Sequence, residues 1–124
     1  MGLSKQLEHY ANLLDQTELN AYVVDVKDVD GHVGYKSEIP QLVEIGAVEK
    51  RYDPRKVIET FHAHKARVIA RIACFKDPLA SSKLPELAIR NKSGEIWVDD
   101  HKKAWLNPYN EKTWEYVVAI AQEA

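Results

Sequence analysis

The feature that most constrains the fold is a pair of short apolar segments, Asn20–Asp28 and Arg67–Phe75, each with the length and composition of a buried β-strand. A helix-like pattern that starts at Asp53-Pro54 separates them, because aspartate can cap a helix and proline fits its first turn. Strand, helix and strand in this order are typical of a βαβ unit. The sequence therefore predicts an α/β fold with parallel strands.

Two further helices are predicted, one over residues 4–14 and one from Asn107-Pro108 onward. Asp30-Gly31 predicts a tight turn after the first strand. The long stretch 77–103 has the length of a functional loop or of a small substructure, and we expect a short helix at 85–87 and a hairpin turning at Ser93-Gly94. The predicted apolar faces are Val57, Ile58, Phe61 and His62 in the helix between the strands and Trp114, Val117, Val118 and Ala121 in the last helix.

Two strands are too few for an independent sheet. A parallel pair leaves hydrogen-bonding edges and apolar faces without partners. We therefore expect residues 1–124 to form a single fragment of a larger sheet, completed by further strands or by another copy of the chain. The second case predicts a homo-oligomer that forms through exposed strand edges.

Composition argues against several functional classes. The 124 residues have a net charge of -2, which favours neither a nucleic-acid surface nor a polybasic membrane patch. The apolar runs are too short for a membrane span, and the N-terminus lacks the apolar centre of a signal peptide, so the compartment stays open. Cys74 is the one cysteine, the histidines lack zinc-site spacing, and no glycine-rich phosphate loop is present. We expect neither a metal nor a cofactor.

Several ordered motifs resemble a known family. Along residues 5–124 they read NAYVVDVKD, DGHVGYKSEIP, YDPRKVIETFHAH, RVIARIACFKDPLA, PELAIRNKSGEIWVDD and AWLNPYNEKTWEYVVAIAQEA. This order resembles a bacterial glycoside hydrolase family that is catalogued as a domain of unknown function. The resemblance implies a (β/α)8 TIM barrel similar to the α-amylase superfamily, of which this chain would supply about the second and third strands with their flanking helices.

The resemblance also implies what the chain does. The family's next strand, an aspartate-bearing FDY-x-RFP type motif and the expected seat of the nucleophile, has no counterpart in this sequence. We therefore expect a barrel fragment similar to a polysaccharide-active glycoside hydrolase that is catalytically inactive alone. Two alternatives stay open: a self-assembling structural fragment without a ligand, and a carbohydrate-binding module.

Charged residues at the ends of the two strands are the first candidate substrate-binding group. Asp25 and Lys27 are two residues apart and should share a face of the strand, with Asp28 on the following loop. They could form a charged floor for a sugar, or a buried ion pair that ties the strand to a loop. Arg71 could orient a carboxylate or a sugar hydroxyl, or form an internal salt bridge. Asp25–Arg71 is the cross-strand contact that we favour.

Aromatic and polar residues near the loops are the second group. By the resemblance, WLNPYN lies at the barrel mouth, with Trp105 as the best candidate for stacking on a sugar ring. Asn107 could contact the ligand or cap the last helix. His32, Tyr35 and Lys36 could line a sugar subsite or belong to an ordinary solvated hairpin, which we favour. Trp97 is expected to pack its hairpin onto the rest of the molecule.

Overall fold

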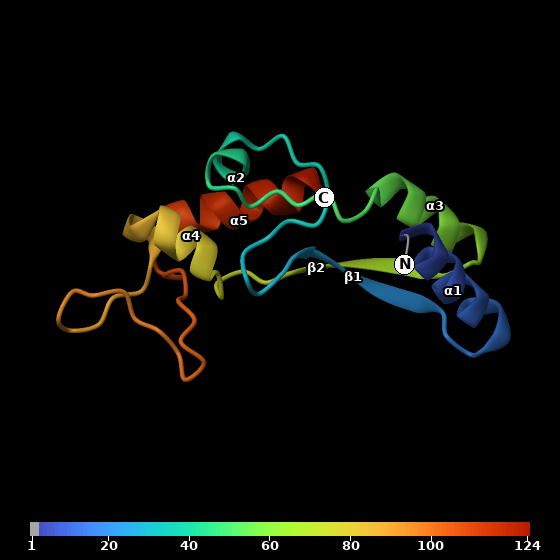
Figure 1. Ribbon diagram of the computed structural model, residues 1–124, viewed down its shortest axis with the longest axis horizontal. Helices are drawn as coiled ribbons and strands as arrows, with labels where there is room; N and C mark the ends of the chain where they lie inside the picture. The colour runs from blue at the N-terminus through green and yellow to red at the C-terminus, as the bar shows by residue number, and fades with distance from the viewer. Residues whose placement is uncertain (1–2) are drawn as a thin grey trace.

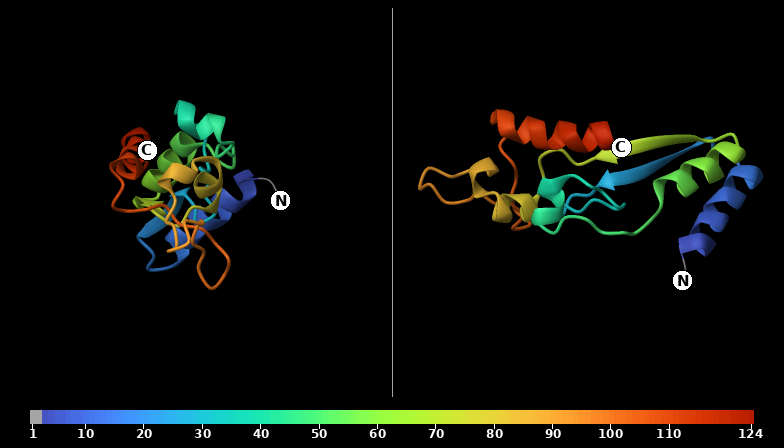
Figure 2. Two further views of the ribbon diagram at one scale, coloured as in Figure 1. Left: turned by 90° about the vertical axis from the view of Figure 1, so that its left-hand side faces the viewer. Right: turned by 90° about the horizontal axis from the view of Figure 1, so that it is seen from above.

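The computed structural model describes residues 3–124, which form an elongated molecule with helices gathered at both ends of a short sheet (Figure 1). Helices α1 and α3 lie side by side at one end, near the start of the strands, while α2, α4 and α5 gather at the other end (Figures 1 and 2). The elements in chain order are α1 (Leu3–Gln16), β1 (Ala21–Lys27), α2 (Pro40–Glu44), α3 (Pro54–Ala63), β2 (Arg67–Ile72), α4 (Pro78–Lys83), the 3-10 helix η1 (Pro85–Leu87) and α5 (Glu111–Glu123).

The sheet consists of β1 and β2, which pair in parallel. The register runs from Ala21 opposite Arg67 to Asp25 opposite Arg71, and an irregularity then places Lys27 opposite Ile72. One extra residue of β1 is thus inserted after Asp25, as in a β-bulge. The predicted α/β fold with parallel strands is confirmed, and the described sheet is open rather than closed into a barrel.

Helix caps explain where most helices begin. The Asp53 carboxylate accepts hydrogen bonds from the backbone N–H groups of Arg55 and Lys56 at the start of α3, as predicted from Asp53-Pro54. Asp77 caps α4 by accepting from the Ala80 N–H, and this helix was not predicted. The last helix starts later than expected, because Asn110 rather than Asn107 is its cap.

The buried faces of α3 and α5 differ in part from the predicted stripes. In α3, Val57 and Phe61 are buried as expected, whereas Ile58 and His62 are exposed. In α5 the buried residues are Thr113, Tyr116 and Ile120, while Trp114 and Val118 are 56% and 49% exposed. The predicted face of α5 is therefore wrong: Ala121 is exposed as well, and of the four predicted residues only Val117 packs in part against the core, because Tyr116 and Ile120 occupy it.

Both predicted turns are present. Asp28 donates its backbone N–H to the His32 carbonyl at 2.9 Å across the first turn, and Gly31 has a φ of 96°. In the second hairpin the Trp97 N–H donates to the Ile89 carbonyl at 2.8 Å, and Gly94 has a φ of 83°. Glycine relieves the steric cost of positive φ at both positions.

The apolar core forms two clusters. One, near the carboxyl ends of the strands, contains Val33, Leu42, Leu106 and Ile120; the other, under the amino ends, contains Leu14, Val57, Phe61 and Ala66. Tyr22, Val24 and Val68 pack against the second cluster, so this face of the sheet is covered by helices. The opposite face carries Val23, Asp25, Ile69 and Arg71, and we call these four residues the open sheet face. No helix among residues 3–124 has the length and apolar character needed to cross a membrane.

Candidate functional site

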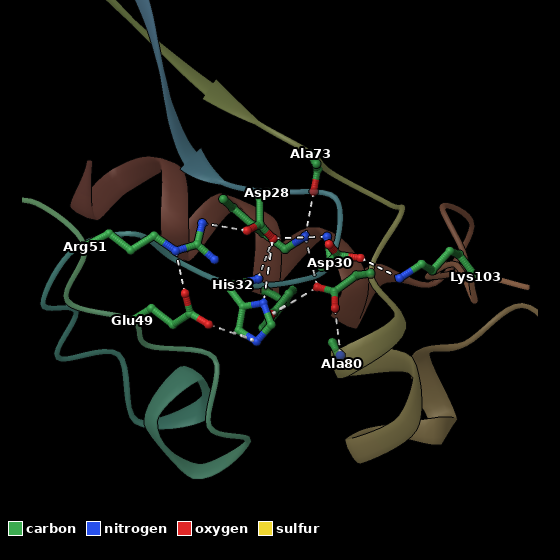
Figure 3. A network of polar contacts seen from close by, with 11 residues as sticks. Asp28, Asp30, His32, Glu49, Arg51, Ala73, Ala80 and Lys103 are labelled. Atoms are coloured by element: carbon green, nitrogen blue, oxygen red, sulfur yellow. Dashed lines mark hydrogen bonds and ion pairs between the residues drawn. The ribbon is translucent and has the colours of Figure 1, made fainter. Parts of the chain in front are cut away.

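The candidate site is the rim formed by the segments beyond the carboxyl ends of β1 and β2. In parallel sheets, ligands gather at this end. Three segments build the rim here: residues 28–35 after β1, residues 73–77 after β2, and residues 99–105 of the long loop. Figure 3 shows the network of polar contacts that joins them.

Lys27 lies beneath the rim and is fully buried. Its Nζ is 3.0 Å from Oδ2 of Asp77, which is also fully buried, and it donates a hydrogen bond to the Ala73 carbonyl at 2.7 Å. The Tyr116 hydroxyl donates to the same Asp77 carboxylate at 3.4 Å. The arrangement matches the ion-pair alternative, and Lys27 has no surface that a ligand could touch.

Asp25 and Lys27 do not point together, contrary to the expectation from their spacing. The bulge after Asp25 breaks the alternation of side chains, so Lys27 turns into the interior while the Asp25 side chain stays 42% exposed.

The predicted contact between Asp25 and Arg71 is present. The guanidinium is bidentate: Nη2 donates to Oδ2 at 2.8 Å and Nε donates to Oδ1. The hydrogen bond from Arg71 lowers the pKa of the Asp25 carboxyl, and burial opposes this shift only in part. The Arg71 side chain is 66% exposed, so the pair is accessible from the open sheet face.

Asp28 organises the first loop. Its Oδ1 accepts hydrogen bonds from the backbone N–H groups of Asp30 and His32, and its Oδ2 accepts from Arg51 Nη1 at 2.8 Å. Arg51 also pairs with Glu49, whose Oε1 is 3.5 Å from His32 Nε2. Burial raises the pKa of Asp28, but the hydrogen bonds from His32 and Arg51 outweigh it and leave the pKa below its ordinary value.

Asp99 organises the long loop in the same way. Its Oδ2 accepts from Lys76 Nζ at 2.9 Å and from Trp105 Nε1 at 3.0 Å. Its Oδ1 accepts from the backbone N–H groups of His101 and Lys103. The bond from Lys76, followed by that from Trp105, holds the pKa of Asp99 well below its usual range.

Trp105 is thereby fixed at the rim by its ring N–H, and Lys76 Nζ lies 5.6 Å from the centre of its ring. Lys103 Nζ pairs with Asp30 at 2.7 Å and joins the long loop to the first loop. Asn107 shapes the turn before α5, because its side-chain oxygen accepts from the Tyr109 N–H at 3.0 Å. It does not cap α5, whose cap is Asn110.

Tyr35 neither lines an open sugar subsite nor belongs to a solvated hairpin, the two alternatives considered for the first loop. Its side chain is buried, and its hydroxyl donates to Glu123 Oε2 at 2.7 Å. Ser37 donates to the same oxygen at 2.5 Å, so the end of α5 anchors this segment. His32 is 29% exposed at the rim, Lys36 is exposed, and Trp97 is 41% exposed.

The shifted carboxyl groups at the rim and beside it all favour the ionised form. Four carboxyl groups of the described residues have a shifted pKa, and all four shifts are downward: Asp25, Asp28, Asp99 and Glu123. A general acid in glycoside hydrolysis needs a raised pKa. These groups can orient hydroxyls or stabilise positive charge, but they do not supply the acid. Across residues 3–124, no group of three His, Cys, Asp or Glu side chains is placed to hold a metal ion.

Sequence reasoning missed Asp77, Asp99 and Arg51. Asp77-Pro78 has the same capping pattern as Asp53-Pro54, so the α4 cap could have been found from the sequence. Arg51 carried no comparable signal, because its contact with Asp28 depends on how the chain returns to β1 after α2.

Comparisons with known proteins agree with this architecture. The model of a family described as "Putative glycosyl hydrolase domain" matches residues 1–124. The crystal structure of a hypothetical protein from Ruminiclostridium thermocellum is similar to this chain, with a TM-score of 0.92 and 51% identity over 98% of this chain. This chain covers 64% of that protein. No curated protein matches at a significant level. Because the family model spans every residue, the chain belongs to the "Putative glycosyl hydrolase domain" family.

Proposed function

We propose that this chain forms part of a (β/α)8 barrel glycoside hydrolase and contributes the part of its mouth that binds a polysaccharide. The observation that carries the proposal is the set of polar side chains in and beyond the carboxyl-terminal halves of two parallel strands, the end at which such barrels bind their ligands. Asp25, Arg71 and Trp105 would contact the sugar. Family membership supports carbohydrate chemistry, while the substrate rests on the proposal alone.

Asp25, Arg71 and Trp105 are assigned to the sugar because their side chains are accessible or offer an apolar ring at this end of the sheet. Asp25 and Arg71 face the open side of the sheet as a preformed bidentate pair, which can exchange hydrogen bonds with vicinal hydroxyls. Trp105 offers an apolar ring that the bond to Asp99 holds in one orientation. Asp28 adds a fixed negative charge at the rim. Lys27 and Asn107 support these groups from beneath and beside the rim.

The 124 residues alone should not hydrolyse a glycoside. Hydrolysis needs two carboxyl groups, one of them protonated, placed on either side of the scissile bond. The shifted carboxyl groups of the rim are all ionised and already bonded to cations or backbone N–H groups. We therefore expect the chain to bind oligosaccharides without turnover.

Calorimetric titration with maltohexaose, cellohexaose and a chito-oligosaccharide tests the proposal. At least one of them should bind, and Arg71→Ala should weaken that binding about tenfold, the effect of losing a charged hydrogen bond. Arg67→Ala is the matched control, because Arg67 is an exposed arginine at the amino end of the same strand. Binding that Arg67→Ala weakens as much as Arg71→Ala, or hydrolysis of any of these sugars by the chain, would contradict the proposal.

A further inference from the structure

The bulge after Asp25 decides how the rim is arranged, because it turns Lys27 inward while the Asp25 side chain stays on the open sheet face. A bulge interrupts the hydrogen bonds of the ladder, so the backbone groups around it need other partners. Two residues outside the sheet supply those partners here: Gly34, in the loop that follows β1, and Tyr52, in the segment that precedes α3.

Both carbonyl groups at the bulge accept hydrogen bonds from these two residues. The Tyr52 hydroxyl donates to the Asp25 carbonyl at 2.9 Å, and the Gly34 N–H donates to the Val26 carbonyl at 3.2 Å. The Gly34 carbonyl in turn accepts from the Tyr52 N–H at 3.1 Å. Gly34 and Tyr52 therefore hold each other as well as the bulge, and we call these two residues the bulge clamp.

The ring of Tyr52 reaches the bulge because residue 34 is glycine. A Cβ at Gly34 would lie 2.6 Å from Cε1 of Tyr52, which is closer than a Cβ can approach another carbon, so even alanine would displace the ring. Gly34 is not among the residues with a positive φ, so the space and not the backbone requires glycine at this position. The partly buried Tyr52 side chain also packs against both apolar clusters, which fixes it from two sides.

We propose that Tyr52 is a positioning residue of the sugar site, which acts through the bulge to keep the Asp25 carboxylate on the open sheet face and level with Arg71. Without the bulge, Asp25 and Lys27 would share one face of β1. One of the two would then lose its ion pair, with Arg71 or with Asp77. The effect of Tyr52 on sugar binding rests on the proposed function, whereas its effect on Asp25 does not.

The carboxyl pKa of Asp25, measured by NMR during a pH titration, tests the positioning without any sugar. The hydrogen bond from Arg71 holds this pKa below its ordinary value. Tyr52→Phe keeps the ring and removes the donor to the Asp25 carbonyl, so the pKa should rise toward the ordinary value as the contact with Arg71 loosens. Gly34→Ala should raise it as well, because it displaces the ring. An Asp25 pKa that is unchanged in both variants would overturn the proposal.

Asp28 is the internal reference in the same spectra. Burial raises its pKa, but hydrogen bonds from His32 and Arg51 outweigh burial, and Tyr52→Phe leaves these bonds in place. The pKa of Asp28 should therefore stay low while that of Asp25 rises. An equal rise at both carboxyl groups would show that the whole rim loosens, and it would overturn a specific role for Tyr52.

Tyr35→Phe is the matched control for the loss of a tyrosine hydroxyl. The Tyr35 side chain is buried, its ring centre lies 6.5 Å from that of Tyr52, and its hydroxyl donates to Glu123 rather than to the bulge. Tyr35→Phe should leave the pKa of Asp25 unchanged, even where it lowers the melting temperature as much as Tyr52→Phe. A rise of the Asp25 pKa as large as that in Tyr52→Phe would contradict the proposal.

A double-mutant cycle then connects the bulge clamp to the sugar. With the oligosaccharide that calorimetry selects, Tyr52→Phe should weaken binding about two- to tenfold, the range for one neutral hydrogen bond. In the Asp25→Ala background the same change should weaken binding no further, because Tyr52 acts through Asp25. Equal weakening in both backgrounds would overturn the proposal. A chain that binds none of the sugars would instead refute the proposed function, and the NMR titration would still decide the role of Tyr52.

Discussion

Lys27 and Asp77 carry the strongest consequence at the scale of single residues. Within residues 3–124 theirs is the one ion pair whose two side chains are both fully buried. Removing one partner leaves an uncompensated charge in the interior, which costs about 3–5 kcal/mol. We expect Lys27→Met to lower the free energy of unfolding by about that amount in urea titrations followed by circular dichroism.

A double variant separates the lost charge pairing from lost packing. Asp77→Asn removes the second charge but keeps an oxygen that can accept from the Ala80 N–H. Lys27→Met combined with Asp77→Asn should therefore be more stable than Lys27→Met alone, although it carries one more change. Lys103→Met is the control at an exposed pair, where we expect little effect. A double variant that is no more stable than Lys27→Met would contradict this account of the pair.

The pH dependence of stability should report on Asp99. Its folded pKa lies below the unfolded value of about 3.9, so on acidification the unfolded chain takes up the proton first. The contribution of Asp99 is thus complete above the unfolded pKa and is lost as the pH falls through the folded pKa. Asp99→Asn should be less stable than wild type at pH 7, and the gap should narrow from about pH 5 toward pH 2.

Comparing wild type and variant at each pH removes the effect of the other carboxyl groups. Urea titrations at several pH values provide the two curves. A stability gap for Asp99→Asn that stays constant down to pH 2 would disprove the role given to Asp99.

At the scale of elements, the turn after β1 is held against the start of α4. Gly31 has a φ of 96°, and a Cβ at this position would overlap Oδ1 of Asp77 and crowd Leu79. Gly94 has a similar φ of 83°, but a Cβ there would meet no atom within 4 Å. The two glycines thus share the backbone cost of a side chain and differ only in the space around them.

Gly31→Ala should therefore destabilise the chain far more than Gly94→Ala. We expect about 1 kcal/mol for the backbone strain that both variants share. At Gly31 the displacement of Asp77 from Lys27 and from the α4 cap adds to this cost. Thermal unfolding of both variants measures the difference, and equal melting temperatures would show that the turn does not pack against Asp77 in this way.

The elements also show how far the sequence alone could lead. Local signals sufficed for β1, β2, α3 and both glycine turns, because apolar composition, a capping aspartate and positive φ act within a few residues. The Asp25–Arg71 pair was predictable as well, since parallel pairing puts residues near the strand ends level with each other. The burial of Lys27 could not be predicted from the sequence. The bulge after Asp25 arises from pairing with β2, and it reverses the side-chain alternation beyond that residue.

The buried face of α5 was unpredictable for a related reason. The two candidate stripes, through Trp114 and Val118 or through Tyr116 and Ile120, have the same helical spacing. The choice between them depends on contacts with the core cluster of Val33, Leu42 and Leu106, which periodicity does not encode. Tyr35 likewise looked like a loop residue until Glu123, which is 88 residues away in the chain, was placed beside it.

At the scale of the whole molecule, the two ends of the sheet have different surroundings. The amino ends are enclosed by α1, α3 and an apolar cluster, which is a stabilising arrangement. The carboxyl ends carry the ion pairs of the rim (Figure 3) and the indole ring of Trp105, together with loops from three parts of the chain. The proposed function assigns the sugar to this second end, and the lowered pKa values of Asp25, Asp28 and Asp99 exclude these three as the acid of the reaction.

Mapping where a sugar binds on the molecule tests this division most directly. Backbone amide shifts of the labelled chain, recorded during titration with the oligosaccharide that calorimetry selects, identify the residues that respond. The account predicts shifts concentrated in residues 25–32, 71–76 and 99–105, with α1 and α3 unaffected. Shifts confined to α1 and α3, or spread evenly over the chain, would contradict it.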